Sequence, residues 1–123
     1  MPKIRVMLAD DQAMLVAALS TILNAQEDIE VVATAASGAD AVSLALQHRI
    51  DVAILDIRMP GMDGIAAAQA ILSRTPDCRI IMLTTFNEED LVSQSIAAGA
   101  HGFLLKDADP ELSLIHISEP TRL

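Results

Sequence analysis

The sequence predicts a doubly wound α/β domain, in which five parallel strands form one sheet that helices cover on both faces. Apolar runs of strand length alternate along the chain with segments whose apolar residues recur at helical spacing. Four of the five strand candidates are almost continuously apolar, which is typical of parallel strands buried on both faces. The 123 residues, 52% of them hydrophobic, are enough for one domain with a single core.

Strands and helices alternate in the first half of the chain. The first strand is expected at residues 4–8, and apolar residues then recur at 3.6-residue spacing over residues 14–23, which indicates an amphipathic helix. A second strand follows at residues 30–35. The run Ser37-Gly38-Ala39-Asp40 resembles a capping box with Asp in place of Glu, and it predicts a helix to about Gln47.

The second half repeats the pattern with clearer helix boundaries. Asp63 is expected to be the N-cap of a helix over residues 64–73. The run Asn87-Glu88-Glu89-Asp90 supplies an N-cap and an acidic first turn to a helix that ends at Gly99. Asp109-Pro110 is a good start for a fifth helix. Three strands are expected here, at residues 52–55, 79–83 and 102–105.

Composition and charge exclude several functional classes. A net charge of −9, from 17 acidic and 8 basic residues, opposes non-specific binding to nucleic acid, which needs a basic footprint. No apolar stretch approaches the roughly 18 residues that a membrane span needs, and no leader-like segment precedes the first apolar run. Cys78 is the single cysteine, and His48, His101 and His116 share no metal-site spacing. We expect a soluble, cytoplasmic protein without a membrane partner.

Polar residues stand at the carboxyl ends of the predicted strands. A charge at the end of a buried strand is costly unless it takes part in chemistry. Carboxyl ends of parallel strands share one edge of the sheet, where ligands of doubly wound domains bind. We therefore expect a single crevice. Its residues are Asp10 and Asp11 after the first strand, Asp56 at the end of the third, Thr84 and Thr85 after the fourth, and Lys106 after the fifth.

The crevice predicts an aspartyl phosphate switch. Carboxylates about 4 Å apart repel by roughly 4 kcal/mol per pair at an effective dielectric of about 20, so three acids together require a cation or a proton. Oxygen ligands without Cys or His favour Mg²⁺, which leaves one acid as a nucleophile for a phosphoryl donor. Lys106 would face the phosphoryl group, and the Thr84 hydroxyl could donate a hydrogen bond to it.

Several motifs are similar to those of one family, the receiver domain of bacterial two-component response regulators. The motifs are Asp10-Asp11, the run Asp56-Ile57-Arg58-Met59-Pro60-Gly61-Met62-Asp63-Gly64, Thr84-Thr85-Phe86, and the run from Gly99 to Asp107 that contains Gly-Phe-Leu-Leu-Lys-Asp. The resemblance covers residues 3 to about 111. The Thr-Thr-Phe and Gly-Phe-Leu-Leu-Lys-Asp motifs are most similar to those of receivers of the NarL/LuxR class, which precede a helix-turn-helix DNA-binding domain.

The resemblance implies a flavodoxin-like fold of strand order 2-1-3-4-5 and a role for each site residue. Asp56 would be the phosphoacceptor. Asp11, Asp56 and the backbone carbonyl of Arg58 would bind Mg²⁺, and Asp10 would help through water. Lys106 would bind the phosphoryl oxygens.

The resemblance also implies a switch and partners. Thr84 and Phe103 match paired switch positions, where the hydroxyl moves toward the phosphoryl group and the aromatic ring turns inward. A sensor histidine kinase would supply the phosphoryl group, and phosphorylation could drive homodimerisation. Control of transcription would require DNA contact through the output domain.

The chain departs from the family after Glu111. Pro120 would end any helix there early. Residues 112–123 resemble the conceptual translation of a transposase adapter used in DNA library preparation. We therefore expect a receiver at residues 1–111 with a truncated fifth helix, a non-native tail at residues 112–123, and an output domain that this sequence lacks.

Two other functions fit parts of the pattern. The first is a stand-alone receiver that acts as a docking or phosphorelay module, and sequence beyond the expected break would discriminate it. The second is a haloacid-dehalogenase-like phosphatase, which also phosphorylates an Asp at a strand end. That family has its nucleophile on the first strand and a second Asp two residues later, whereas Asp56 ends the third strand and Arg58 holds the later position. We expect a signalling domain that catalyses at most its own phosphorylation and dephosphorylation.

Overall fold

The computed structural model of the chain describes residues 2–84 and 89–106, with Glu89 described by its backbone alone. Five strands and four helices alternate within these residues. Several expected features lie outside them, namely Thr85, Phe86, the N-cap at Asn87, the fifth helix at Asp109, His116 and the tail at residues 112–123.

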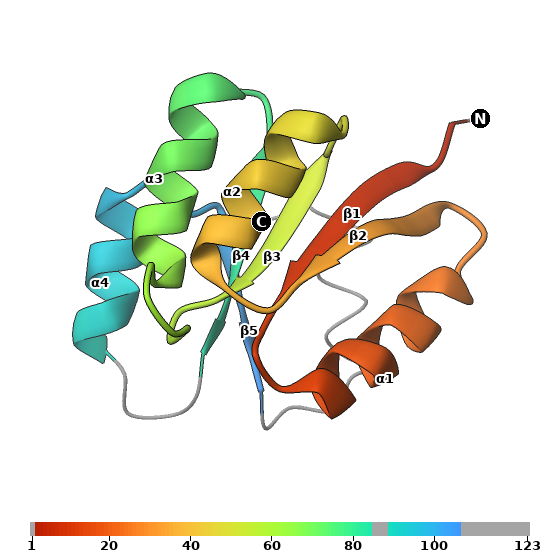
Figure 1. Cartoon of the computed structure of the whole chain (residues 1–123), viewed down its shortest axis with the longest axis horizontal. Helices are drawn as coiled ribbons and strands as arrows, with labels where there is room; N and C mark the ends of the chain where they lie inside the picture. The colour runs from red at the N-terminus through yellow and green to blue at the C-terminus, as the bar shows by residue number, and fades with distance from the viewer. Residues whose placement is uncertain (1, 85–88, 107–123) are drawn as a thin grey trace.

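The strands form one parallel sheet of order β2-β1-β3-β4-β5, which confirms the predicted architecture (Figure 1). Every strand lies within one residue of its expected bounds, because each is a short and mostly apolar run. The strands are β1 (Ile4–Ala9), β2 (Ile29–Ala35), β3 (Val52–Asp56), β4 (Arg79–Thr84) and β5 (Gly102–Leu105).

Two of the described helices begin where the sequence predicts an N-cap. The Ser37 hydroxyl accepts from the Asp40 N–H at 3.2 Å, and the Asp63 carboxylate accepts from the Ala66 N–H at 2.8 Å. Gly99, just beyond the last helix, has a φ of 107°, a left-handed conformation that favours glycine. The helices are α1 (Ala13–Asn24), α2 (Gly38–Gln47), α3 (Gly64–Arg74) and α4 (Glu89–Ala97).

Helices lie on both faces of the sheet, with α2, α3 and α4 on one face and α1 on the other (Figure 1). Successive strand residues point to opposite faces, so Met7 and Leu55 belong to the core under α2 to α4. Leu8 and Ile54 belong to the core under α1. The central strands are buried on both faces, which explains their continuous hydrophobicity.

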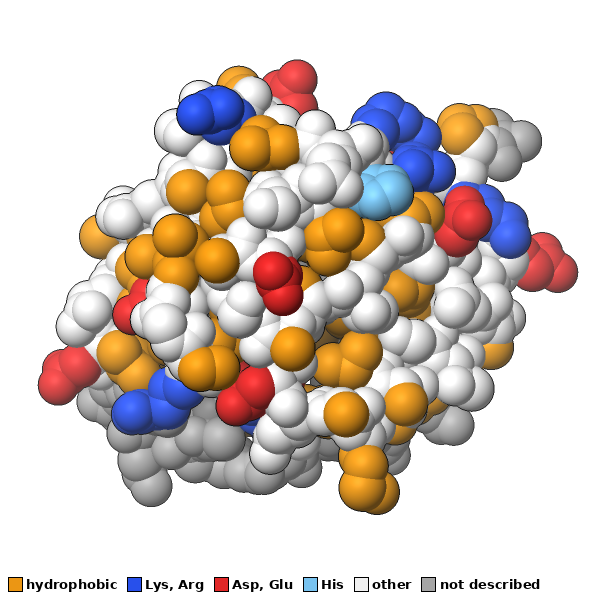
Figure 2. All heavy atoms as spheres, viewed as in Figure 1, with side chains coloured by type: hydrophobic (Ala, Val, Ile, Leu, Met, Phe, Trp, Pro, Cys, Tyr) orange, Lys and Arg blue, Asp and Glu red, His pale blue; other side chains and the backbone are white. Residues whose placement is uncertain are grey.

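The surface over α2 and α3 carries few charged side chains (Figure 2). Leu46 of α2 and Met62, which precedes α3, are exposed hydrophobic residues. Among the described helices, none is long and apolar enough to cross a membrane.

Candidate functional site

Strand register places two acids side by side at the carboxyl edge of the sheet. Ala9 of β1 pairs with Leu55 of β3, so the residues that follow them, Asp10 and Asp56, are neighbours. Both are buried, with exposed fractions of 2% and 4%, whereas the adjacent Asp11 is exposed. The structure thus brings together the three acids that were expected in one crevice.

The three acids form a group that fits a small divalent cation. One carboxylate oxygen each from Asp10, Asp11 and Asp56 lies within 4.8 Å of the others. Carboxylate ligands without Cys or His suit Mg²⁺ better than zinc. Asp10 Oδ2 is buried and makes no hydrogen bond, and its one charged contact is the Lys106 ammonium at 3.0 Å.

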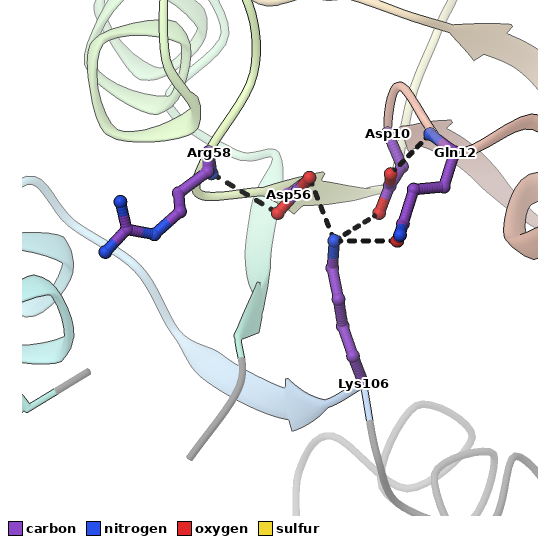
Figure 3. A network of polar contacts seen from close by, with 5 residues as sticks. All are labelled: Asp10, Gln12, Asp56, Arg58 and Lys106. Carbon is purple, nitrogen blue, oxygen red and sulfur yellow. Dashed lines mark hydrogen bonds and ion pairs between the residues drawn. The ribbon is translucent and has the colours of Figure 1, made fainter. Parts of the chain in front are cut away.

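Lys106 completes the crevice from the end of β5 (Figure 3). Its Nζ lies 3.0 Å from Asp10 Oδ2 and 3.0 Å from Asp56 Oδ2. The contact with Asp10 is an ion pair whose angles do not suit a hydrogen bond. The Lys106 N–H donates to the Thr84 carbonyl at 2.8 Å, which ties the lysine to the end of β4.

Each buried carboxylate uses its other oxygen for a local backbone hydrogen bond. Asp10 Oδ1 accepts from the Gln12 N–H at 2.8 Å, and Asp56 Oδ1 accepts from the Arg58 N–H at 3.2 Å. Such bonds to the residue two positions later are typical of Asp at the start of a turn. They orient both side chains so that each Oδ2 faces Lys106 (Figure 3).

A groove of about 580 Å³ lies beside the acid cluster. A ligand in this groove would contact Asp11 and the loop that follows β3. The lining residues are Asp11, Ile57, Arg58, Met59, Pro60, Gly61, Asp63 and Leu91.

The family model for the response regulator receiver domain matches residues 6–117 of the chain. This chain belongs to the response regulator receiver family. The match extends past residue 111, where we expected the native domain to break off, and that boundary remains a prediction. The family comprises signalling domains, and its match gives no support to the phosphatase alternative.

Relatives of this receiver include transcriptional regulators. The transcriptional regulatory protein YxjL of Bacillus subtilis is 46% identical over 109 residues, covering 89% of this chain and 50% of that protein. The oxygen regulatory protein NreC of Staphylococcus epidermidis is 41% identical over 114 residues, covering 92% of this chain and 52% of that protein. The receiver therefore spans about half the length of the curated relatives that it matches.

Solved structures agree with this assignment. The receiver domain of a Mycobacterium tuberculosis response regulator named NarL superposes with a TM-score of 0.91 at 34% identity, covering 99% of this chain and 98% of that one. CheY of Borrelia burgdorferi, in a complex with CheX, BeF₃ and Mg²⁺, superposes with a TM-score of 0.88 at 31% identity, covering 99% of this chain and 91% of that one. A LuxR-family regulator from Staphylococcus aureus superposes with a TM-score of 0.87 at 28% identity, covering 94% of this chain and 97% of that one. The matches to the NarL receiver and to the curated regulators confirm the predicted NarL/LuxR class.

Burial alters proton affinity in the receiver's crevice. Removal from water raises the pKa of Asp56 above its ordinary 3.8, an effect that Lys106 opposes and Asp10 reinforces. Burial also works against the Lys106 ammonium, but contacts with Asp56 and Asp10 outweigh it and raise the pKa of Lys106 above 10.5. The crevice therefore holds a lysine that stays protonated beside a carboxylate whose charged form further positive charge would stabilise.

Gly64 shapes the site from the first residue of α3, although the sequence indicated only a helix start there. Its N–H donates to the Ile57 carbonyl at 2.9 Å. A Cβ at this position would collide with the Asp56 carbonyl oxygen. Only glycine lets α3 pack this closely against the end of β3, so the helix helps to fix the backbone of Asp56.

The two expected switch residues lie on neighbouring strands. Thr84 is buried at the end of β4, where it pairs with Leu105. Phe103 of β5 pairs with Met82, is partly buried, and packs against the core under α2 to α4. A change at the end of β4 can therefore reach β5 directly.

Two contacts were not foreseen from the sequence. Gln12 Oε1 accepts a hydrogen bond from Lys106 Nζ at 3.2 Å (Figure 3). His101 is exposed, as expected, yet it makes two hydrogen bonds to Ile80. The ring Nδ1 of His101 accepts from the Ile80 N–H at 3.0 Å, and the backbone N–H of His101 donates to the Ile80 carbonyl at 2.8 Å. For Gln12 the local signal is its place just before the first helix, where Ser, Thr, Asp or Asn is preferred and Gln is not, so that its side chain is available for another contact. No local pattern indicated the role of His101.

Proposed function

We propose that Asp56 is the phosphoacceptor of this receiver and that a sensor histidine kinase supplies the phosphoryl group. The observation that carries the proposal is the contact between Lys106 and Asp56, in which Nζ lies 3.0 Å from Oδ2. A fixed ammonium at this point neutralises charge on incoming phosphoryl oxygens, which the crowded acids would otherwise repel.

In the proposed reaction, a carboxylate oxygen of Asp56 forms a bond to phosphorus while the bond from phosphorus to the donor's imidazole nitrogen breaks. The electron pair of the broken bond stays on that nitrogen, and the imidazole leaves as a neutral ring that keeps a proton on its other nitrogen. Phosphoryl transfer of this kind depends mainly on position and charge. Lys106 supplies the charge, and the Arg58 N–H, 3.2 Å from Asp56 Oδ1, holds the nucleophile in position.

We further propose that the crevice holds Mg²⁺. Asp11, Asp56 and the Arg58 backbone carbonyl would bind the ion, and Asp10 would contribute through water. When bound, the ion would neutralise and orient phosphoryl oxygens. Support comes from the clustered carboxylates and from the burial of Asp10 and Asp56, whose charges Lys106 alone offsets among the described residues. The complex of the related Borrelia CheY, which includes BeF₃ and Mg²⁺, supports the same assignment.

The readout that we propose runs from Thr84 to Phe103. The Thr84 hydroxyl would donate to the new phosphoryl group, whose charge is large enough to move a loop. Phe103 would repack on the neighbouring strand, where it already contacts the core under α4. The surface from α4 to β5 would change and could support a homodimer of phosphorylated receivers.

The output proposed for the whole protein is control of transcription in the cytoplasm. Relatives named as transcriptional regulators are about twice as long as the matched segment, which leaves room for a DNA-binding domain. In this proposal, residues 112–123 are not native and replace the path to that domain. A stand-alone docking or phosphorelay receiver is the alternative, and an intact copy of the gene would distinguish the two.

The acceptor can be tested by intact mass spectrometry. The chain is incubated with Mg²⁺ and a small phosphodonor such as acetyl phosphate, beside Asp56→Asn and the control Asp51→Asn, which changes a half-buried carboxylate outside the acid cluster. We expect one phosphoryl adduct on the parent and on Asp51→Asn, and none on Asp56→Asn. An adduct of equal yield on Asp56→Asn would show that another residue is the acceptor.

A further inference from the structure

Gln12 occupies the N-cap position of α1 without serving as a cap. Its backbone is extended, with φ of −88° and ψ of 97°, and its side chain makes no hydrogen bond to the helix. N-cap positions favour Ser, Thr, Asp and Asn, whose short side chains reach the free N–H groups of the first turn. The longer Gln side chain instead extends across the crevice toward β5 (Figure 3).

Gln12 contacts both charged partners of the site. Its N–H donates to Asp10 Oδ1 at 2.8 Å, and its Oε1 accepts from Lys106 Nζ at 3.2 Å. Three oxygens therefore surround the ammonium, and the third, from Gln12, is neutral. The two carboxylate oxygens, from Asp10 and Asp56, each lie 3.0 Å from Nζ.

We propose that Gln12 is a positioning residue that holds the Lys106 ammonium over the crevice when the carboxylates are engaged elsewhere. The inference rests on the proposed function, in which Asp56 gains a phosphoryl group and Asp10 contributes to a cation site through water. Both charged acceptors of Lys106 are then altered. The Gln12 amide oxygen is unaffected by either event, because it carries no charge and is not part of the acid cluster.

The consequence is a lysine that remains in reach of the phosphoryl oxygens. Without the Gln12 side chain, the Lys106 ammonium would contact only the two carboxylates. It would then have to leave them at each phosphoryl transfer. A hydrogen bond to a charged group on the rim of a crevice contributes only a modest free energy. We therefore expect removal of the Gln12 acceptor to weaken binding of a phosphoryl mimic roughly three- to tenfold.

The test compares Gln12→Met, which keeps length and removes the acceptor, with Gln12→Glu, which keeps an acceptor oxygen at the same reach. Ala13→Gly is the control, because it weakens the first turn of α1 and leaves the Gln12 side chain intact. Affinity for BeF₃⁻ is measured at saturating Mg²⁺, Mg²⁺ affinity is measured alone, and the Lys106 ammonium resonance is followed by NMR in the full 123-residue chain.

We expect Gln12→Met to weaken BeF₃⁻ binding three- to tenfold, to leave Mg²⁺ affinity within about twofold, and to lose the protected ammonium resonance. Gln12→Glu should retain that resonance, and Ala13→Gly should bind BeF₃⁻ as the parent does. Parent-like BeF₃⁻ binding by Gln12→Met, or an equal loss in Ala13→Gly, would overturn the inference. Failure of the parent itself to bind BeF₃⁻ would instead refute the proposed phosphoacceptor site.

Discussion

The ammonium of Lys106 lies 3.0 Å from Oδ2 of Asp56, although the two residues come from different strands at the carboxyl edge of the sheet. The side chains are only 16% and 5% exposed, so each is held largely away from water. Removing Lys106 would leave two buried carboxylates without compensation, whereas removing the Asp56 charge would leave Lys106 paired with Asp10 at 3.0 Å. We therefore expect this contact to contribute to the stability of the receiver.

Replacement of Lys106 by Met should destabilise the receiver in the absence of divalent ions. We expect a loss of roughly 2 to 4 kcal/mol in the free energy of unfolding, because the Asp10 and Asp56 carboxylates would repel each other. Urea unfolding with EDTA measures the loss, and added Mg²⁺ should recover part of it. The control is Arg49→Met, which removes the exposed pair of Arg49 and Asp51 and should cost about 0 to 1 kcal/mol. Equal losses in the two variants would contradict the prediction.

Asp56→Asn should stabilise the receiver more at pH 7 than at pH 4 in EDTA. The pKa of Asp56 is raised in the folded state by burial, so the native state binds its proton more tightly than the unfolded chain does. The stabilisation from this group is thus present below the ordinary value of 3.8 and is lost as the pH rises through the higher folded pKa. Asn cannot ionise and escapes that loss. Urea unfolding from pH 4 to pH 7 measures the difference in unfolding free energy between the parent and Asp56→Asn. A difference that does not change with pH would show that folding leaves the pKa of Asp56 unaltered.

Gly64→Ala should distort the site rather than merely stiffen a helix. The new methyl group would collide with the Asp56 carbonyl, and overpacking of this kind costs about 1 to 3 kcal/mol. We also expect weaker Mg²⁺ binding, measured by calorimetry, because the end of β3 must shift. Gly61→Ala is the control. Gly61 has a φ of 70° and no neighbour that a Cβ would meet, so that change should cost backbone strain without the clash.

His101 should make the receiver less stable in mild acid. Partial removal of the ring from water, with help from the charge of Arg79, lowers the pKa of His101 below 6.5. The neutral ring is the form whose Nδ1 accepts from the Ile80 N–H. The lowered folded pKa gives stability that is present above pH 6.5 and is lost as the pH falls toward that folded value.

The measurement is the difference in unfolding free energy between the parent and His101→Gln from pH 7.5 to pH 5. Other histidines remain in both proteins, so their titration cancels. The advantage of the parent should shrink as the pH falls. A constant advantage would mean that protonation of His101 does not disturb the hydrogen bond to Ile80.

Much of the fold was predictable because it follows from local sequence. Apolar runs such as the one that ends at Asp56 are typical of strands in a sheet buried on both faces, and Ser37 and Asp63 cap helices within their own turns. The acids and the lysine were placed at one edge because all parallel strands share that edge. Their roles in phosphoryl transfer remain a prediction that the experiments above would test.

The sequence by itself determined the alternation of strands and helices, the family, and which charged residues stand at strand ends. Tertiary structure decided the rest, because contacts between distant segments depend on register and packing that no local pattern encodes. Only the packed structure places Lys106 within hydrogen-bond distance of Gln12 as well as close to the acids. It also packs Gly64 against the Asp56 carbonyl, and it brings the His101 ring to the Ile80 N–H. Each of these contacts joins two segments that become neighbours only when the sheet and its helices have packed.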